Sequence, residues 1–375
     1  MPIDARGLLV LGLVLGACAP QRPSSLASPA PQAPSEPADP AAAALDQKAP
    51  QWLAEHHVPS ISVAYIRGGR VQWTRVYGEQ SEGVPATEST LYNVASLAKP
   101  VFAETMLRLA AAGRLSLDEP LAGHWVDPDV AGDPRHQRLT PRIALSHRTG
   151  FPNWRYQQPG RVLAFQRDPG TFGYSGEGYE YTKRFAQNKL GTPWEALANE
   201  YVLQPLGMTN TASTRRDWFA GRIAMPFGPE GRYGEPSIKD SVVVSDDLYT
   251  TAGDYARFLV GVMHREGLAP AYAAQRDSAH VVNEAAMAQC DPAQVAVCPR
   301  VGMGLGWEII QFPGETVRMH SGSDWGEKAM AFYFAESRDG VVMLTNGANG
   351  MNVMLRVIDL LFPQTQLAAD VRRHF

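Results

Sequence analysis

The chain has little cysteine, no long apolar stretch after its N-terminus and almost no excess charge. Its 375 residues include only three cysteines, at positions 18, 290 and 298, and no Cys-x-x-Cys pair. We therefore do not expect a thiolate metal site. No later apolar run is long enough for a membrane-spanning helix. The net charge is −4 with no basic run, so we expect no nucleic-acid partner.

Several catalytic signatures are also missing from the sequence. No Gly-x-Ser-x-Gly occurs, which argues against the nucleophile elbow of α/β-hydrolases. No His-x-His or His-Glu-x-x-His occurs, which disfavours a metal-dependent hydrolase, and we expect no metal and no other cofactor. The sequence is 45% hydrophobic, which is enough to form one large domain or two intertwined ones.

The N-terminus has the pattern of an export signal. A short apolar run over residues 8–15 is followed by Gly16, Ala17 and Cys18. An apolar segment that ends in small residues is typical of a secretory signal peptide. The cysteine at that point resembles a bacterial lipoprotein signal, in which Cys18 becomes the lipidated first residue; the alternative is an ordinary cleavage site with an incidental cysteine. We predict a lipoprotein-type signal peptide over residues 1–18, and an exported periplasmic or cell-envelope protein anchored in the lipid bilayer.

Composition changes sharply after Cys18. Residues 19–46 are rich in Pro, Ala and Ser, and such a segment cannot bury enough apolar surface to order itself. We expect a disordered tether there and a single folded domain over residues 47–375. In an exported chain Cys290 and Cys298 are candidates for a disulfide that closes a small loop; no nearby His cluster favours a metal instead.

Hydrophobic patterning indicates an α/β (α+β) fold. Two β-rich runs around Gly68 and Gly69 predict a hairpin, and residues from about 115 to 300 are helix-rich with many Pro and Gly loops. Strand signals return over 305–310, 317–322, 329–335 and 340–346, before a final helix over 352–361. We therefore predict an antiparallel sheet built from both chain ends, flanked by helices and carrying a helix-rich insertion.

The stretch from Asn93 to Met106 has the pattern of a helix start and contains two candidate catalytic residues. Ser96 is expected at the N-cap or in the first turn, and Gly113 as the stop signal. Ser96 and Lys99, three residues apart, share one helix face at the positive end of the helix dipole, which favours an alkoxide. A Ser-x-x-Lys arises by chance about once in a chain this long, so its context must decide.

Three stretches in order supply that context. Residues 96–99 (Ser-Leu-Ala-Lys), 169–176 (Pro-Gly-Thr-Phe-Gly-Tyr-Ser-Gly) and 320–322 (His-Ser-Gly) resemble the active-site motifs of the serine β-lactamase and penicillin-binding-protein superfamily. The resemblance is strongest to class C β-lactamases, D-Ala-D-Ala carboxypeptidases of the same type and β-lactamase-like esterases. It covers nearly all of residues 47–361 and implies the β-lactamase-like fold.

The resemblance implies three catalytic residues: Ser96, Lys99 and Tyr174. Ser96 would attack a carbonyl and become acylated, which splits one difficult step into two. Tyr174 would accept the serine proton, helped by the nearby Lys99 cation, and would later activate water for deacylation. Tyr179 and Tyr181 are the neighbouring alternatives for this role.

The third motif would bind the substrate through His320, Ser321, Gly322 and Ser323. His320 stands where the family has Lys or His, and would hold a substrate carboxylate or the hydrogen bonds of the site; the alternative is a satisfied structural histidine. Gly322 would let the substrate backbone approach the strand. The N–H groups of Ser96 and Ser323 would form the oxyanion hole.

Two positions complicate this assignment. His147 invites a Ser-His-Asp triad with Ser96, although by resemblance it belongs to a structural segment. The second motif usually reads Tyr-x-Asn, and here Gly176 replaces the asparagine whose amide would bind a substrate amide. That replacement leaves the hydrolytic machinery intact but weakens the case for β-lactam recognition.

We therefore expect an exported serine hydrolase that acts on carboxylic esters or peptidoglycan-type acyl compounds. A class C-like β-lactamase or a D-Ala-D-Ala carboxypeptidase is the first alternative, so the small-molecule partner is an ester, a β-lactam or a peptidoglycan fragment. A non-catalytic envelope protein that kept this fold as a binding module is the second. The joint presence of Ser96, Lys99 and Tyr174 argues against it.

Overall fold

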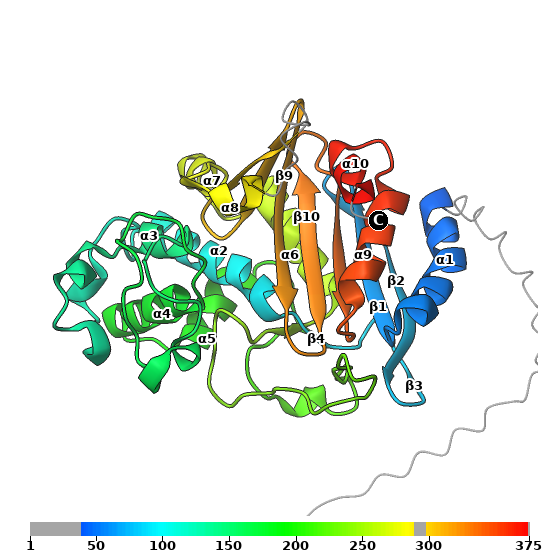
Figure 1. Cartoon of the computed structure of the whole chain (residues 1–375), viewed down its shortest axis with the longest axis horizontal. Helices are drawn as coiled ribbons and strands as arrows, with labels where there is room; N and C mark the ends of the chain where they lie inside the picture. The colour runs from blue at the N-terminus through cyan, green and yellow to red at the C-terminus, as the bar shows by residue number, and fades with distance from the viewer. Residues whose placement is uncertain (1–38, 289–297, 374–375) are drawn as a thin grey trace, which may run out of the picture. The chain divides into compact units, whose positions relative to one another are not determined.

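A single antiparallel sheet joins the two ends of the folded chain. The computed structural model describes residues 39–288 and 298–373. Nine strands are hydrogen-bonded in the order β3-β2-β1-β11-β10-β9-β8-β7-β6 (Figure 1). Strands β1 and β11 pair in antiparallel register, with Ile61 opposite Thr345. The prediction of one sheet built from both chain ends is confirmed.

The strands and helices have the following bounds. The large sheet consists of β1 (Ser60–Arg67), β2 (Arg70–Ser81), β3 (Val84–Pro85), β6 (Val281–Val282), β7 (Arg300–Met303), β8 (Glu308–Phe312), β9 (Glu315–Ser323), β10 (Lys328–Phe334) and β11 (Gly340–Thr345). A separate pair is formed by β4 (Tyr92–Asn93) and β5 (Tyr249–Thr250). The helices are α1 (Pro40–His56), α2 (Ala98–Ala111), α3 (Pro141–Leu145), α4 (Gly176–Leu190), α5 (Trp194–Ala198), α6 (Ala252–His264), α7 (Pro270–Arg276), α8 (Glu284–Met287), α9 (Gly350–Leu361) and α10 (Gln366–Arg372).

Helices cover both faces of the sheet because its central strands are apolar on both sides. Strand β11 is buried along its whole length, and β1 is buried except at its last residue. Helices α1, α9 and α10 pack on one face, where Leu45, Val353 and Leu367 meet the sheet. Helix α6 and the start of α2 pack on the other face through Phe258 and Val101 (Figure 1). The turn that begins α2 thus lies against the middle of the sheet.

The folded part begins earlier than the composition suggested. Helix α1 starts at Pro40, before the expected boundary at Gln47, because Asp39 caps it by accepting the Ala41 N–H at 2.8 Å and Pro40 occupies the first helical position. Ala42 and Leu45 are buried in the core. The alanine-rich segment before Gln47, which we expected to be part of the tether, is therefore helical, because its few apolar side chains pack against the sheet.

Some expectations concern residues outside the described ranges. Cys18 and Cys290 both lie there, so lipidation of Cys18 and the Cys290–Cys298 disulfide stay predictions. Within residues 39–288 and 298–373, no helix is long and apolar enough to cross a membrane.

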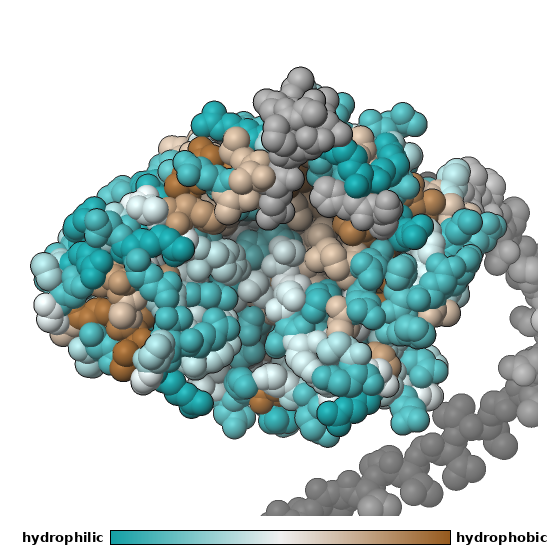
Figure 2. All heavy atoms as spheres, in the orientation of Figure 1, coloured by the Kyte–Doolittle hydropathy of each residue, from teal (hydrophilic) through white to brown (hydrophobic). Residues whose placement is uncertain are grey.

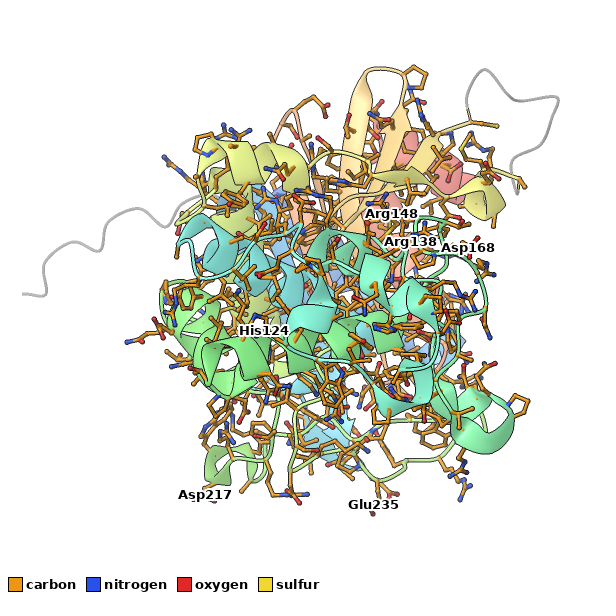
Figure 3. All side chains as sticks on the ribbon, turned by 90° about the vertical axis from the view of Figure 1, so that its left-hand side faces the viewer. His124, Arg138, Arg148, Asp168, Asp217 and Glu235 are labelled. Carbon is orange, nitrogen blue, oxygen red and sulfur yellow. The ribbon has the colours of Figure 1, made fainter. Side chains whose placement is uncertain are left out.

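The helix-rich insertion carries a pair of crossed loops that fix the second motif. Figure 3 shows Arg138, Arg148 and Asp168 gathered at one corner of this part. Arg138 donates to the Pro169 carbonyl at 2.8 Å, and the Gly170 N–H donates to the Arg148 carbonyl at 2.8 Å. Gly150 has φ +82°, and a Cβ there would lie 2.2 Å from a backbone oxygen of the crossing loop. The loops approach too closely for any side chain at that position.

Candidate active site

Ser96 lies in a tight turn rather than at a conventional helix cap. A 3₁₀ turn over Ala95–Leu97 leads directly into α2, and no side chain caps either of these two described elements. Ala95 adopts φ +46°, a left-handed conformation that costs a non-glycine residue free energy, and its N–H donates to Asn93 Oδ1 at 3.1 Å. The strained turn presents the Ser96 hydroxyl toward Lys99 instead of using it to cap the helix.

Lys99 is buried beneath the Ser96 hydroxyl. Its side chain has 0% exposure, and Nζ donates to Ser96 Oγ at 2.9 Å and to the Ser245 carbonyl at 2.6 Å. The same Nζ lies 4.9 Å from the centroid of the Tyr174 ring. A positive charge held at hydrogen-bond distance stabilises an alkoxide on Ser96. The predicted Ser96–Lys99 pair is therefore present as a direct contact.

His147 positions Tyr174 by stacking. The two rings lie 4.1 Å apart at 22°, and His147 Nδ1 accepts the Ser175 N–H at 3.0 Å. Burial, with a further contribution from Lys99, holds the pKa of His147 well below its ordinary value. A neutral histidine that accepts a backbone N–H beside Tyr174 orients that loop; the hydrogen bonds of the described residues give no triad through His147.

The alternative tyrosines are engaged elsewhere. Tyr179 is fully buried and its hydroxyl donates to the Leu145 carbonyl at 3.0 Å. The Tyr181 hydroxyl donates to the Trp125 carbonyl at 3.3 Å. Tyr174, in contrast, is 36% exposed and lines the cavity that holds Ser96. Geometry therefore favours Tyr174 among the three.

The packing of strand β9 explains why residue 322 is glycine. A Cβ at this position would lie 1.9 Å from the Val94 carbonyl oxygen and 3.1 Å from the Leu97 amide nitrogen. Strand β9 thus runs directly against the turn that carries Ser96, and only glycine permits that approach. The turn that carries Ser96 itself requires a glycine here, and the expected role of Gly322 in the approach of substrate stays a prediction.

His320 is buried and uncharged. It is 5% exposed, and its Nδ1–H donates to the Ser321 carbonyl at 2.7 Å. Burial, assisted by the Lys99 charge, lowers its pKa to about 3. Two roles were expected for His320. A neutral ring is suited to holding the hydrogen bonds of the site, but it does not supply a positive charge for a substrate carboxylate.

A cavity of about 260 Å³ opens beside Ser96. It is lined by Ser96, Phe172, Tyr174, Asn283, Met303, Glu308, His320, Ser321 and Ser323. Figure 2 shows a hollow in this face of the molecule, between β9 and the helix-rich part. Sequence reasoning missed Asn283, Met303 and Glu308, because they come from separate strands and loops and no local motif marks them.

Trp154 fills the place next to Gly176. A Cβ at position 176 would lie 3.1 Å from two atoms of the Trp154 ring. The Gly176 N–H donates to Asn153 Oδ1 at 2.9 Å. An asparagine at position 176 would therefore crowd the Trp154 ring, which would have to move by a few tenths of an ångström, and no sequence motif pointed to Trp154.

Three buried carboxyl groups, of which Asp246 interacts with Lys99, are held toward their neutral form. Burial, more than the Asp324 and Glu180 charges, raises the pKa of Asp246 to about 6, while Lys99 opposes the shift. Burial and then Asp246 raise the pKa of Asp247 to about 7. Burial and then Asp324 raise that of Glu327 to about 8. In the described part of the chain, no group of three or more His, Cys, Asp or Glu side chains could hold a metal ion.

Known proteins share this architecture. The sequence profile of the family described as Beta-lactamase matches residues 45–361. Esterase EstB of Burkholderia gladioli is 26% identical, over 84% of this chain and 93% of its own. Penicillin-binding protein 4 of Amycolatopsis lactamdurans is 26% identical, over 78% of this chain and 82% of its own. A solved class C beta-lactamase superposes with a TM-score of 0.71 at 17% identity, covering 86% of this chain and 96% of its own, which shows a shared fold.

Proposed function

Because the chain belongs to the beta-lactamase family, we propose that it is an exported serine hydrolase that forms an acyl-enzyme on Ser96, with carboxylic esters as its preferred substrates. The observation that carries the proposal is the buried Lys99 ammonium 2.9 Å from Ser96 Oγ, at the floor of a cavity large enough for a small substrate. Ser96, Lys99 and Tyr174 each have a separate role in the proposed reaction.

The reaction proceeds in two balanced steps. Ser96 Oγ forms a bond to the substrate carbonyl carbon, Tyr174 takes the serine proton, and the bond from that carbon to the leaving oxygen breaks as the alcohol receives the proton. Water then attacks the acyl carbon and gives a proton to the Tyr174 phenolate, the bond from that carbon to Ser96 Oγ breaks, and Tyr174 returns the proton to Ser96 as the acid leaves. Lys99 donates to both of its neighbours as an ammonium, which leaves proton transfer to Tyr174.

Esters are favoured over amide-bearing acyl donors because of Trp154 and Gly176. A β-lactam or acyl-D-Ala-D-Ala substrate brings a side-chain amide, and a buried amide without a partner costs about 1–3 kcal/mol. Trp154 offers indole where the family has an amide. A short acyl ester has no such group to satisfy.

A substrate panel tests the preference. The purified protein should hydrolyse a short-chain p-nitrophenyl ester with a higher kcat/KM than a good cephalosporin or an acyl-D-Ala-D-Ala peptide, and Ser96→Ala should abolish the ester activity. Faster turnover of the cephalosporin or of the peptide would establish the β-lactamase or carboxypeptidase alternative. Absence of all three activities would favour the non-catalytic binding protein.

Export and anchoring are part of the same proposal and rest on residues 1–18. If Cys18 is lipidated, the processed protein will be in the membrane fraction, and Cys18→Ala will release it or leave it uncleaved. A processed Cys18→Ala protein that stays in the membrane fraction would contradict the anchor.

A further inference from the structure

The cavity beside Ser96 lies at an open edge of strand β9. Strand β8 pairs with β9 from Phe312 opposite Glu315 to Glu308 opposite Met319. Beyond Met319 the strand continues to Ser323 with β10 as its partner on the other side. Glu308, the first residue of β8, therefore stands where the ladder ends and the cavity begins.

Among the described residues that line this cavity, one is acidic and none is a lysine or an arginine. Glu308 is the acid, and His320, the one histidine of that lining, is neutral because burial and Lys99 lower its pKa to about 3. Lys99 has 0% exposure and is covered by its bonds to Ser96 and Ser245. A ligand in the cavity thus meets a carboxylate whose neighbours in this lining carry no positive charge.

Glu308 has a neutral partner. Its side chain is hydrogen-bonded to Asn283, and none of the ion pairs of the described residues includes it. Burial raises the pKa of this carboxyl, because its charge is poorly solvated. Glu104, in contrast, is buried and pairs with Arg276 at 3.2 Å. A half-buried carboxylate without a cation gains most from a positively charged ligand.

Two further acidic side chains, Asp246 and Asp324, interact with each other, and Asp246 also interacts with Lys99. Asp324 follows Ser323 directly in the sequence, and Asp246 is close enough to Lys99 for each charge to act on the other. Asp324 and Asp246 also act on the exposed ring of Tyr156. When ionised, these two carboxylates add negative charge close to the site, and the Lys99 charge beside Ser96 offsets part of it.

We propose that this cavity selects esters that carry a cationic group and rejects those that carry a carboxylate, with Glu308 as the specificity-determining residue. This inference rests on the proposed function, because it names the substrate class of the same site. Penicillins, cephalosporins and D-Ala-D-Ala peptides all carry a carboxylate, which Glu308 would repel wherever that group entered the cavity. A quaternary ammonium or a primary amine would fill the same space with favourable charge.

Matched thioesters separate charge from shape. S-acetylthiocholine is cationic, its 3,3-dimethylbutyl analogue is neutral and nearly isosteric, and S-acetyl-3-mercaptopropionate is anionic; thiol release reports all three. We expect the wild-type kcat/KM to fall in that order, by about tenfold or more per step, since like charges in a site cost several kcal/mol. A second series with the charge on the acyl arm covers the other orientation of the substrate.

Glu308→Gln keeps the shape of the side chain and removes the charge. We expect it to reduce the cation-to-neutral ratio of kcat/KM by about tenfold and to raise the anion-to-neutral ratio. Glu82→Gln makes the same change in net charge at an exposed turn far along the sequence, and should leave both ratios unchanged. The wild-type ranking itself needs no variant, so the proposal stays testable if Glu308→Gln folds poorly.

Three results would overturn the inference, and they are distinguishable. Ser96-dependent hydrolysis of the neutral thioester without any preference for the cation, in both series, would remove the selectivity and leave the serine hydrolase intact. Retention of the full wild-type preference by Glu308→Gln would likewise remove Glu308 as its source. Absence of hydrolysis of every ester by the wild-type protein would instead remove the proposed function and this inference with it.

Discussion

At the scale of single residues, close contacts fix the orientation of the polar side chains in the site. Ser96 meets Lys99 because a left-handed Ala95 turns the chain immediately before α2. Tyr174 stands over the same lysine because His147 stacks beneath it. These side chains come from separate elements, and the proposed chemistry depends on the fold holding them in fixed relative positions.

Lys99 and Tyr174 should act as one proton-transfer unit. Lys99→Ala and Tyr174→Phe should each lower ester turnover by about 10²–10⁴-fold, the usual scale for a positioned acid–base group. The double variant should be little worse than either single one, because both remove the same function. Steady-state kinetics on a short-chain ester measure this, with Tyr181→Phe as the matched control. Near-wild-type turnover by Tyr174→Phe would place the base elsewhere.

Gly176 and Trp154 should be coupled. Gly176→Asn puts a Cβ 3.1 Å from the Trp154 ring, and we expect overpacking to cost about 1–3 kcal/mol in the free energy of unfolding. Trp154→Ala in the same chain should recover part of that loss and allow the new amide to improve cephalosporin turnover. Denaturant unfolding and kinetics on the three variants test both statements. A fully stable Gly176→Asn that already hydrolyses cephalosporins better would contradict the coupling.

At the scale of elements, helix α2 is the part on which the site depends, and a buried ion network anchors it. Glu104 lies 3.4 Å from Arg108 on the same helix and 3.2 Å from Arg276 at the end of α7. Arg276 also donates to the Val262 carbonyl of α6 at 3.0 Å. Helix α2, which follows Ser96, is therefore linked to α7 through the Glu104 carboxylate and to α6 through Arg276.

Removing that carboxylate should strongly destabilise the fold. Glu104→Gln would leave Arg108 and Arg276 with less charge compensation in the interior, and we expect a loss of about 3–5 kcal/mol in the free energy of unfolding. The control is Glu119→Gln, which breaks the partly exposed Lys189 pair and should cost less than about 1 kcal/mol. Equal losses in the free energy of unfolding of the two variants, measured in urea, would show that burial does not make the ion network more important for stability.

The sequence could predict the elements that carry a local pattern. The hairpin around Gly68, the C-terminal strands and the Ser96 helix followed from periodicity and turn residues. The edge strand β6 and its neighbour β7 were not foreseen, because Val281–Val282 and Arg300–Met303 are too short to show alternation. Helix α1 was placed too late because alanine-rich composition hid its few buried apolar residues.

For the site, the sequence could predict the residues within motifs but not those brought in by the fold. The three-residue spacing predicted the contact of Ser96 with Lys99, which forms across the 3₁₀ turn that leads into α2. Glu308 lines the cavity and Trp154 packs against Gly176 of the second motif, and no single stretch of sequence reveals either contact. The role of Gly322 was missed for the same reason, since Val94 meets it only in the folded chain.

At the scale of the whole molecule, buried carboxyl groups with raised pKa values link stability to pH. The pKa of Asp247 is raised to about 7, against about 3.9 in an unfolded chain, chiefly by burial. Between those values the folded protein binds more protons than the unfolded one. The free energy of unfolding therefore falls as pH rises through this window, and the contribution is lost above about pH 7.

Asp247→Asn should flatten this dependence. In the wild-type protein the free energy of unfolding should be larger at pH 5 than at pH 8, and the variant should reduce the difference by about 1–3 kcal/mol. Asp118→Asn is the control, because its Arg142 partner lowers the pKa of Asp118 and moves its linkage below pH 5. Urea unfolding at several pH values decides it, and an unchanged slope in Asp247→Asn would rule out this residue as the source.

The central claim for the molecule as a whole is that catalysis passes through one serine. Mass spectrometry of the intact protein and of its peptides, after reaction with a fluorophosphonate, tests it most directly. We predict a single adduct on Ser96, lost in Ser96→Ala and formed slowly in Lys99→Ala, because the buried ammonium stabilises the attacking oxygen. An adduct on Ser175 or Ser321, or none at all on a protein that still hydrolyses esters, would contradict it.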